Sequence, residues 1–339
     1  MFILIERKTY GEQMHKNTDF IYEAIGKLEE LSKMPIKIQS SRELFDVILD
    51  IQGTQFYVIA KKNAKNYTYG LILTDLNKVD SSKNVLFIAD HISGKLAKQL
   101  QENNINYLDA AGNTFIKCQD LFVFIEGQKS ILSKKNNQSR LFQETGLKLL
   151  LLLISNPVVL EESYRSIAEK ADVSLGSVSI VFNELEEQNF LLRSQENKIL
   201  KNRDELIQRW LIGYNEIIRP KIIRKKMRAV GEESLMERVK ESNLKIFFGG
   251  ELAGQLLTKH LKPQNLVLYS NEDLNLIGKE LKLIPDENGN IELRAKFWSD
   301  EVPLAGNNLA PKLVVYADLM GTGNNRNIET AQLILEDGI

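Results

Sequence analysis

The chain of 339 residues has a mass of 38.7 kDa, and its 44 basic and 45 acidic residues leave a formal net charge of -1. Hydrophobic residues make up 43% and charged residues 26%, which excludes global disorder, a fibrous repeat and a small disulfide-stapled fold. Because the chain has no net positive charge, any binding to nucleic acid or to an anionic membrane must come from local patches. The length predicts two or three domains.

Cysteine usage and apolar runs indicate the cellular compartment. The single cysteine, Cys118, excludes an internal disulfide and a zinc site of cysteine pairs, which favours the cytoplasm. The longest apolar run, Leu149–Ile154, is six residues long and too short to span a membrane. We therefore expect a cytoplasmic protein with no membrane partner.

Residues 1–132 are predicted to form an α/β domain. A helix is expected over 17–33, where Thr18 can cap the first turn, and a second one over Gly94–Asn103. Residues 133–140 are polar and indicate a linker. The strand-like runs of this domain are Leu44–Ile51, Gln55–Ala60, Gly70–Leu73, Val85–Ile88, Ile105–Leu108, Thr114–Ile116 and Leu121–Ile125.

This order of elements resembles the restriction-endonuclease-like fold. Such nucleases carry an acidic residue on one strand and an acid-x-lysine pair on the next, and the carboxylates hold a divalent metal. Asp46 and Asp50 are available on the first strand and Lys61 on the next, but Ile59 stands where the second carboxylate should be. We expect an inactive scaffold without a metal or cofactor. A Mg²⁺-dependent nuclease that uses Asp46, Asp50 and Lys61 is the alternative.

The segment Asp109–Asn113 has two interpretations. It can be a turn between strands, in which Gly112 and Asn113 tolerate a positive φ and Asp109 bonds its neighbours. Alternatively, Asp109 and Asn113 can belong to a binding surface. The turn is the favoured interpretation.

The middle of the chain is predicted to hold three helices and a hairpin. The helices are expected over Leu147–Ser155, Tyr164–Ala171 and from Leu175 to about Gln188, with Ser163 and Ser174 as caps of the second and third. A hairpin is expected from Phe190 to Leu200. The residues from Ser166 to Ser179 have the small side chains and the tight turn of a winged helix-turn-helix, which this segment resembles.

The third helix of that segment is predicted to be the recognition helix that contacts DNA. Ser174, Ser177 and Ser179 are short polar residues at its front, where such helices meet the major groove. The helix carries three glutamates and no basic residue, so Arg193 and Lys198 of the hairpin would have to supply phosphate contacts. The alternative is a winged helix that serves only as a protein-interaction module.

A basic run follows from Arg219 to Arg228, with six basic residues in ten. We expect a long basic helix. It is either an ordinary solvated face or a set of phosphate contacts through Arg224, Lys225 and Arg228.

A series of short motifs spans about residues 85–336 and includes none of catalytic type. Among them are Tyr107-Leu108-Asp109-Ala110-Ala111-Gly112-Asn113, Trp210, Tyr214, Arg219-Pro220-Lys221, Phe248-Gly249-Gly250-Glu251, Leu261-Lys262-Pro263, Phe297-Trp298 and Pro311-Lys312-Leu313. In their order and spacing, these motifs resemble one known family, the AbiEi-like antitoxins and transcriptional regulators of type IV, abortive-infection toxin–antitoxin systems.

The resemblance implies a regulator that binds double-stranded DNA at its own promoter, represses its operon and counteracts a nucleotidyltransferase-like toxin. The C-terminal part itself resembles a nucleotidyltransferase fold, because Phe247-Phe248-Gly249-Gly250-Glu251 follows a strand and opens a helix. The fold would be degenerate, since Gly250 replaces the expected serine and the next strand, Leu266–Ser270, has no carboxylate. We expect no enzymatic activity.

The overall expectation is an α+β protein of several domains. They are a restriction-endonuclease-like domain (1–132), a linker (133–140), a winged helix-turn-helix (141–201), and a basic helix with a C-terminal α/β domain (202–339) that binds a partner protein or forms a homodimer.

Overall fold

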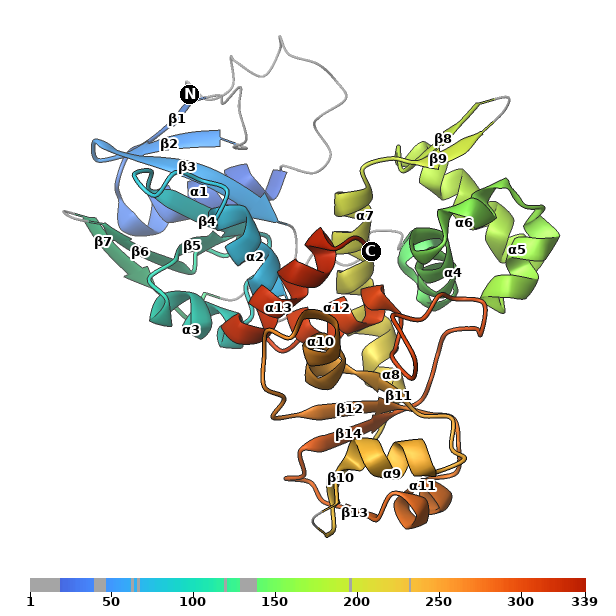
Figure 1. Cartoon of the computed structure of the whole chain (residues 1–339). Helices are drawn as coiled ribbons and strands as arrows, with labels where there is room; N and C mark the ends of the chain where they lie inside the picture. Colours follow the sequence, from blue (N-terminus) through green and yellow to red (C-terminus); the bar gives the residue numbers. More distant parts are fainter. Residues whose placement is uncertain are drawn as a thin grey trace. The chain divides into compact units, whose positions relative to one another are not determined.

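Two large β-sheets, of seven and five strands, lie one in each of the two units of the computed structural model (Figure 1). The structure describes residues 19–39, 47–61, 64–65, 68–118, 121–128, 139–194, 197–231 and 233–339. Thr18, Asp46 and most of the expected linker lie outside them. The units are Met1–Lys134 and Lys135–Ile339. The expected mixture of helices and sheets is confirmed, while the finer division into domains stays a prediction.

The first unit is built on a seven-stranded sheet whose strands follow one another in chain order. Strands β3, β4 and β5 are parallel, and the other neighbours are antiparallel. The strands are β1 (Ile36–Gln39), β2 (Val47–Ile51), β3 (Thr54–Lys61), β4 (Val85–Ala89), β5 (Asn106–Asp109), β6 (Thr114–Cys118) and β7 (Leu121–Ile125).

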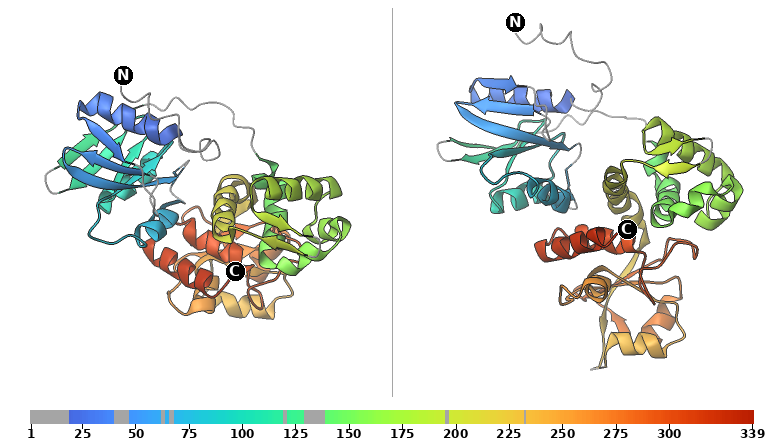
Figure 2. Two further views of the ribbon diagram at one scale, coloured as in Figure 1. Left: turned by 90° about the horizontal axis from the view of Figure 1, so that it is seen from above. Right: turned by 45° about the horizontal axis from the view of Figure 1, so that its top comes forward.

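Helix α1 (Asp19–Ser32) packs across one face of this sheet and closes its core (Figure 2). Its buried residues Ile21, Ile25 and Leu28 recur at helical spacing and meet alternate residues of the central strands. Helices α2 (Tyr69–Leu76) and α3 (Gly94–Glu102) connect the parallel strands.

One predicted strand of this unit is wrong. Gly70–Leu73 lies inside the helix α2. Tyr69 to Ile72 are all buried, and a short apolar run that is buried on every side fits a strand and a helix equally well. The helix forms because β3 and β4 run parallel and require a crossover. Strand β1 was not expected.

The Asp109–Asn113 segment is a turn. The Asp109 carboxylate is fully buried and accepts hydrogen bonds from the backbone N–H groups of Ala111 (3.1 Å) and Asn113 (2.9 Å) and from the Asn113 amide. Gly112 has a φ of +96°, and a Cβ there would lie 2.6 Å from Leu31 Cδ1. The favoured interpretation is therefore confirmed.

The second unit begins with helices and a hairpin. A short 3₁₀ turn, η3 (Arg140–Phe142), leads into α4 (Glu144–Ser155), and a second, η4 (Pro157–Glu161), leads to α5 and α6. The predicted limits of α5 (Tyr164–Ala171) and α6 (Leu175–Glu187) agree closely with the structure. Strands β8 (Leu191–Arg193) and β9 (Lys198–Leu200) form the expected hairpin.

Helix α7 (Arg203–Gly213) joins this helical lobe to a five-stranded sheet of order β11-β12-β14-β10-β13 (Figure 1). Its strands are β10 (Ile223–Ala229), β11 (Phe247–Gly249), β12 (Leu266–Tyr269), β13 (Leu283–Pro285) and β14 (Ile291–Arg294). Helices of this lobe are α9 (Leu235–Glu241), α10 (Gly250–Thr258), α11 (Leu274–Glu280), α12 (Lys312–Met320) and α13 (Asn325–Glu336).

The expected long basic helix is wrong. After α7, a π-helical turn (Tyr214–Ile218) and the short helix α8 (Arg219–Ile222) are followed by strand β10. Basic residues favour helices only weakly, and the pairing of β10 with both β14 and β13 outweighs that preference. Arg224, Lys225 and Arg228 therefore lie on a strand.

A buried ion pair lies at the centre of this lobe. Arg294 of β14 donates a hydrogen bond to Asp318 of α12, and both side chains are almost fully buried. The hydroxyls of Tyr214 and Tyr269 also donate to Asp318, each at 2.9 Å. Burial raises the pKa of both tyrosines well above their usual range, so that both stay protonated. The backbone N–H of Gly250 adds a further bond at 3.2 Å.

Removal of one partner should destabilise this lobe. Asp318→Ala leaves Arg294 charged and buried without its counterion, and we expect a loss of about 3–5 kcal/mol in the free energy of unfolding. Trp210 and Trp298 are the only tryptophans of the chain, so their fluorescence in denaturant reports this unit alone.

Asp337→Ala is the control, because it breaks the exposed pair with Lys312 and should cost less than about 1 kcal/mol. The double variant Arg294→Met, Asp318→Leu should be more stable than Asp318→Ala. Equal losses for Asp318→Ala and Asp337→Ala would contradict the central role of the pair.

Candidate nucleic-acid interface

The chain between α5 and α6 is fixed by two serine caps. Ser163 and Ser174 accept hydrogen bonds from the backbone N–H groups of Ser166 and Ser177, both at 3.2 Å, as the sequence predicts. Asp172 takes the left-handed conformation that turns the chain between the helices. Val178, Val181, Phe182 and Leu185 of α6 are buried, so the helix has a defined inner face and a defined outer face.

The front of α6 is exposed and uncharged. Ser174, Leu175 and Gly176 are open to solvent, with 47% of Leu175 exposed. The hydroxyls of Ser174 and Ser177 lie 2.8 Å apart, and the Ser179 hydroxyl reaches the carbonyl of Leu175 at 3.5 Å. The three predicted serines thus gather at one end of the helix.

Asn183 continues this outer face and was not singled out from the sequence. It is exposed and lies seven residues after Gly176, which corresponds to two helical turns. The helical period counted from Ser179 could have identified it. An asparagine can pair bidentately with adenine in the major groove, which makes this position relevant to base reading.

Two of the three glutamates of α6, Glu184 and Glu186, bond to other residues of the protein. The Glu184 carboxylate accepts hydrogen bonds from the backbone N–H groups of Arg140 (3.1 Å) and Leu141 (2.9 Å), and it fixes η3 against α6. Glu186 lies 2.6 Å from Arg193 Nε on the hairpin. The negative charge of this helix is therefore partly compensated within the lobe.

The predicted basic residues of the hairpin have internal partners. Arg193 also donates to the Tyr164 hydroxyl. The Lys198 ammonium donates to the carbonyl of Leu160, and its backbone N–H bonds Glu161 at 2.7 Å. Any phosphate contact of these two side chains must compete with these bonds.

The basic residues of β10 lie on another part of the second unit. Arg224 donates to the carbonyls of Ser270 (3.2 Å) and Glu272 (2.7 Å), Arg228 pairs with Asp286 (3.2 Å), and Lys225 is exposed. Strand β10 belongs to the sheet, away from α6 (Figure 1). The structure does not bring these residues together with the serines, and their role as phosphate contacts stays a prediction.

Helix α4 connects the helical lobe to the sheet lobe. The Trp210 indole N–H donates to the carbonyl of Leu147 at 2.8 Å, and a Cβ at Gly213 would lie 2.7 Å from the Leu147 side chain. Lys221 pairs with Glu144 at 2.7 Å, and this hydrogen bond lowers the pKa of the Glu144 carboxyl. At the far end, Ser299 donates to the carbonyl of Lys170 in α5.

The residues of the nuclease alternative do not converge in the described structure. Asp50 lies opposite Gln55 in the β2–β3 ladder and bonds the backbone of Gly53 at 3.0 Å. Lys61 is six residues further along β3, about 20 Å away at ordinary strand spacing, and pairs with Asp75 at 2.6 Å. Ile59 is buried, and Asp46 lies outside the described residues.

The glycine pair of the C-terminal lobe serves a strand-to-helix turn. Gly250 has a φ of +52°, and a Cβ at Gly249 would lie 2.6 Å from the Tyr269 ring. The carboxylate of Asp273 accepts hydrogen bonds from the backbone N–H groups of Asn275 and Leu276 and so caps α11.

Among the described residues, no group of three or more histidines, cysteines and carboxylates is arranged to hold a metal, and no helix could span a membrane.

A comparison with family models found one match. Residues 198–339 match the family described as "Transcriptional regulator, AbiEi antitoxin, Type IV TA system". The match covers 142 of the 339 residues, so the similarity is to the C-terminal part of the chain. The resemblance read from the sequence is therefore confirmed for α7 and the sheet lobe, whereas α4, α5 and α6 precede the matched residues. No curated protein and no solved structure matches the chain.

Proposed function

We propose that the protein is a cytoplasmic DNA-binding antitoxin that represses its own operon and counteracts a nucleotidyltransferase-like toxin. The observation that carries the DNA-binding half is the exposed, uncharged front of α6, held by serine caps beside a hairpin. Three helices and a hairpin in this order support a winged helix-turn-helix. In this proposal α6 enters the major groove.

The side chains on the outer face of α6 suggest which DNA contacts each residue would make. Ser174, Ser177 and Ser179 supply short hydroxyls to bases or phosphates, and Asn183 supplies an amide that can read adenine. Small side chains allow the helix to approach base edges closely. Glu187 is exposed on the same helix and disfavours deep insertion of its C-terminal end.

The charge of this lobe limits its affinity for DNA. Residues 139–201 contain seven basic and nine acidic side chains, a net charge of −2. Because phosphate neutralisation drives nonspecific binding, this lobe should bind nonspecific DNA weakly and depend on base contacts for its operator. Two copies on a symmetric operator would add affinity through a second recognition helix.

The antitoxin half is assigned to the part of the chain that matches the family, residues 198–339. The first unit and the sheet lobe carry degenerate catalytic motifs, which supports a role without enzymatic activity. The separation of Asp50 from Lys61 makes the nuclease alternative less favourable.

A change on the outer face of α6 should abolish operator recognition. The variant Ser179→Glu, Asn183→Glu places two carboxylates against the phosphates, and we expect affinity for the region upstream of its own gene to fall by about tenfold or more. Fluorescence anisotropy with a labelled duplex measures it. Asn288→Glu, in an exposed turn of the sheet lobe, should bind as the wild type does. An unchanged affinity of the double variant would refute this placement of DNA.

The antitoxin assignment predicts a specific result in cells. Co-expression of the chain with a nucleotidyltransferase-like gene from the same operon should restore growth that the toxin alone arrests. The Ser179→Glu, Asn183→Glu variant should restore growth equally well, because its changes lie outside the family match. Failure of the wild-type chain to restore growth would exclude the assignment.

A further inference from the structure

The basic side chains of the helical lobe differ in whether they have partners. Lys148 pairs with Glu144, Lys170 with Glu162 and Arg193 with Glu186, while Lys198 donates to a backbone carbonyl. Within the described residues 139–194 and 197–201, the basic side chains without a hydrogen bond or an ion pair are Arg140, Arg165 and Lys201. These three are free to meet an external anion.

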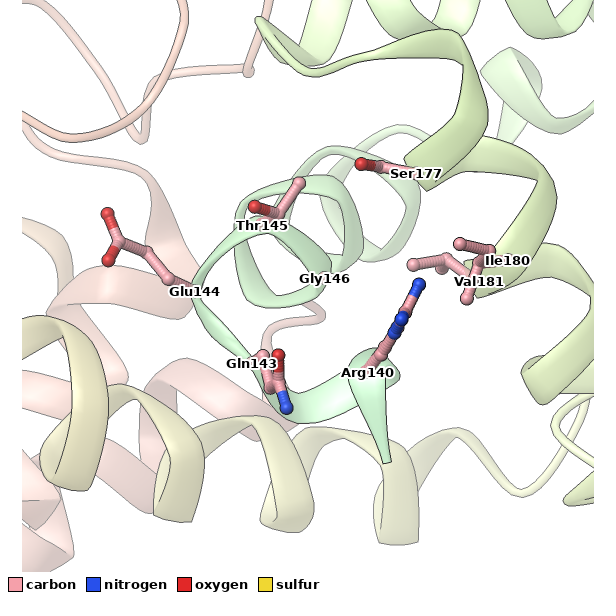
Figure 3. A pocket seen from close by; sticks show the side chains of 8 residues that line it. All are labelled: Arg140, Gln143, Glu144, Thr145, Gly146, Ser177, Ile180 and Val181. Atoms are coloured by element: carbon pink, nitrogen blue, oxygen red, sulfur yellow. The ribbon is translucent and has the colours of Figure 1, made fainter. Parts of the chain in front are cut away.

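Arg140 is distinguished by its position in a pocket. A pocket of about 300 Å³ lies between the start of α4 and the first half of α6, and its lining includes Arg140, Thr145 and Ser177. Figure 3 shows the Arg140 side chain extending from η3 towards Ile180 and Val181 of α6. A guanidinium and two hydroxyls therefore share one opening beside the predicted recognition helix.

The acidic residue of this pocket does not oppose an anion. Glu144 points away from α6 (Figure 3), and its carboxylate is held by Lys221 at 2.7 Å and by Lys148 at 3.7 Å. The backbone that carries Arg140 is fixed in turn by Glu184 of α6. The backbone of Arg140 is therefore held in place, while its guanidinium has no counterion among the described residues.

The pocket and the hairpin lie on opposite flanks of α6. Ser177 and Val181, one turn apart, line the pocket, whereas Glu186 pairs with the hairpin through Arg193. At about 100° per residue, these two sets of positions lie on either side of the outer face formed by Gly176 and Asn183. A helix in the major groove has a sugar-phosphate strand along each flank.

We propose that Arg140, in this pocket, binds a backbone phosphate of the DNA strand that runs along the flank of α6 opposite the hairpin. The inference rests on the proposed DNA-binding function and adds a contact that the sequence did not indicate. A guanidinium suits it because its fork of N–H donors matches two oxygens of a phosphate. The contact carries no base specificity and fixes the position of the helix.

The test compares Arg140→Gln with Lys148→Gln, which removes one positive charge from the following helix α4 at a residue that does not line the pocket. Full-length proteins are titrated by fluorescence anisotropy with the upstream duplex and with a scrambled duplex of equal length over a salt series. We expect Arg140→Gln to weaken both complexes by about three- to tenfold and to lower the slope of log affinity against log salt by about one. Lys148→Gln should leave the slope unchanged.

The outcomes separate this inference from the proposed function. A wild-type chain that binds neither duplex overturns both. A wild-type chain that binds its operator, with Arg140→Gln showing an unchanged slope, overturns the Arg140 contact alone. A thermal-shift titration with inorganic phosphate adds a third outcome. If the wild type binds phosphate and Arg140→Gln does not, while DNA affinity is unchanged, the pocket is a site for a free anion and the proposal is wrong.

Discussion

The buried pair of Arg294 and Asp318 is the interaction on which the second unit depends. It joins a strand to a helix in the centre of the sheet lobe, and Tyr214 bonds the same carboxylate. The Tyr214 ring stacks on Trp210, whose indole N–H is bonded to α4. A continuous set of contacts therefore runs from the sheet lobe to the helix that supports α6. These contacts connect α4, which packs against α6, to a polar cluster whose side chains are buried.

The second constraint is the scarcity of free positive charge. Most basic side chains near α6 form internal bonds, and four of the six basic residues between Arg219 and Arg228 lie on strand β10 of the sheet lobe. A protein of this kind cannot rely on a broad cationic surface. The proposed DNA-binding function therefore requires a few phosphate contacts combined with close base contacts, which favours specificity over affinity. The pairing of Glu184 and Glu186 inside the lobe makes the acidic helix compatible with that role.

Local patterns predicted the local structure well where capping and periodicity agree. The limits of α5 and α6 followed from Ser163 and Ser174, and the hairpin from its alternation. Two predictions were wrong where contacts between distant segments determine whether a segment forms a helix or a strand. Gly70–Leu73 lies in a crossover helix between parallel strands, and the run after Ile222 forms an interior strand of the five-stranded sheet. The partners of Arg193 and Lys198 and the pocket of Arg140 depend on contacts between distant residues, which no single segment reveals.

Hydrogen–deuterium exchange on the full-length protein, with and without a duplex of its own upstream region, tests whether DNA lies along α6. We expect the duplex to protect the backbone amides from Ser174 to Asn183, together with those around Arg140, and to leave β10 unchanged. Protection confined to the sheet lobe, or none at any saturating concentration of duplex, would contradict it.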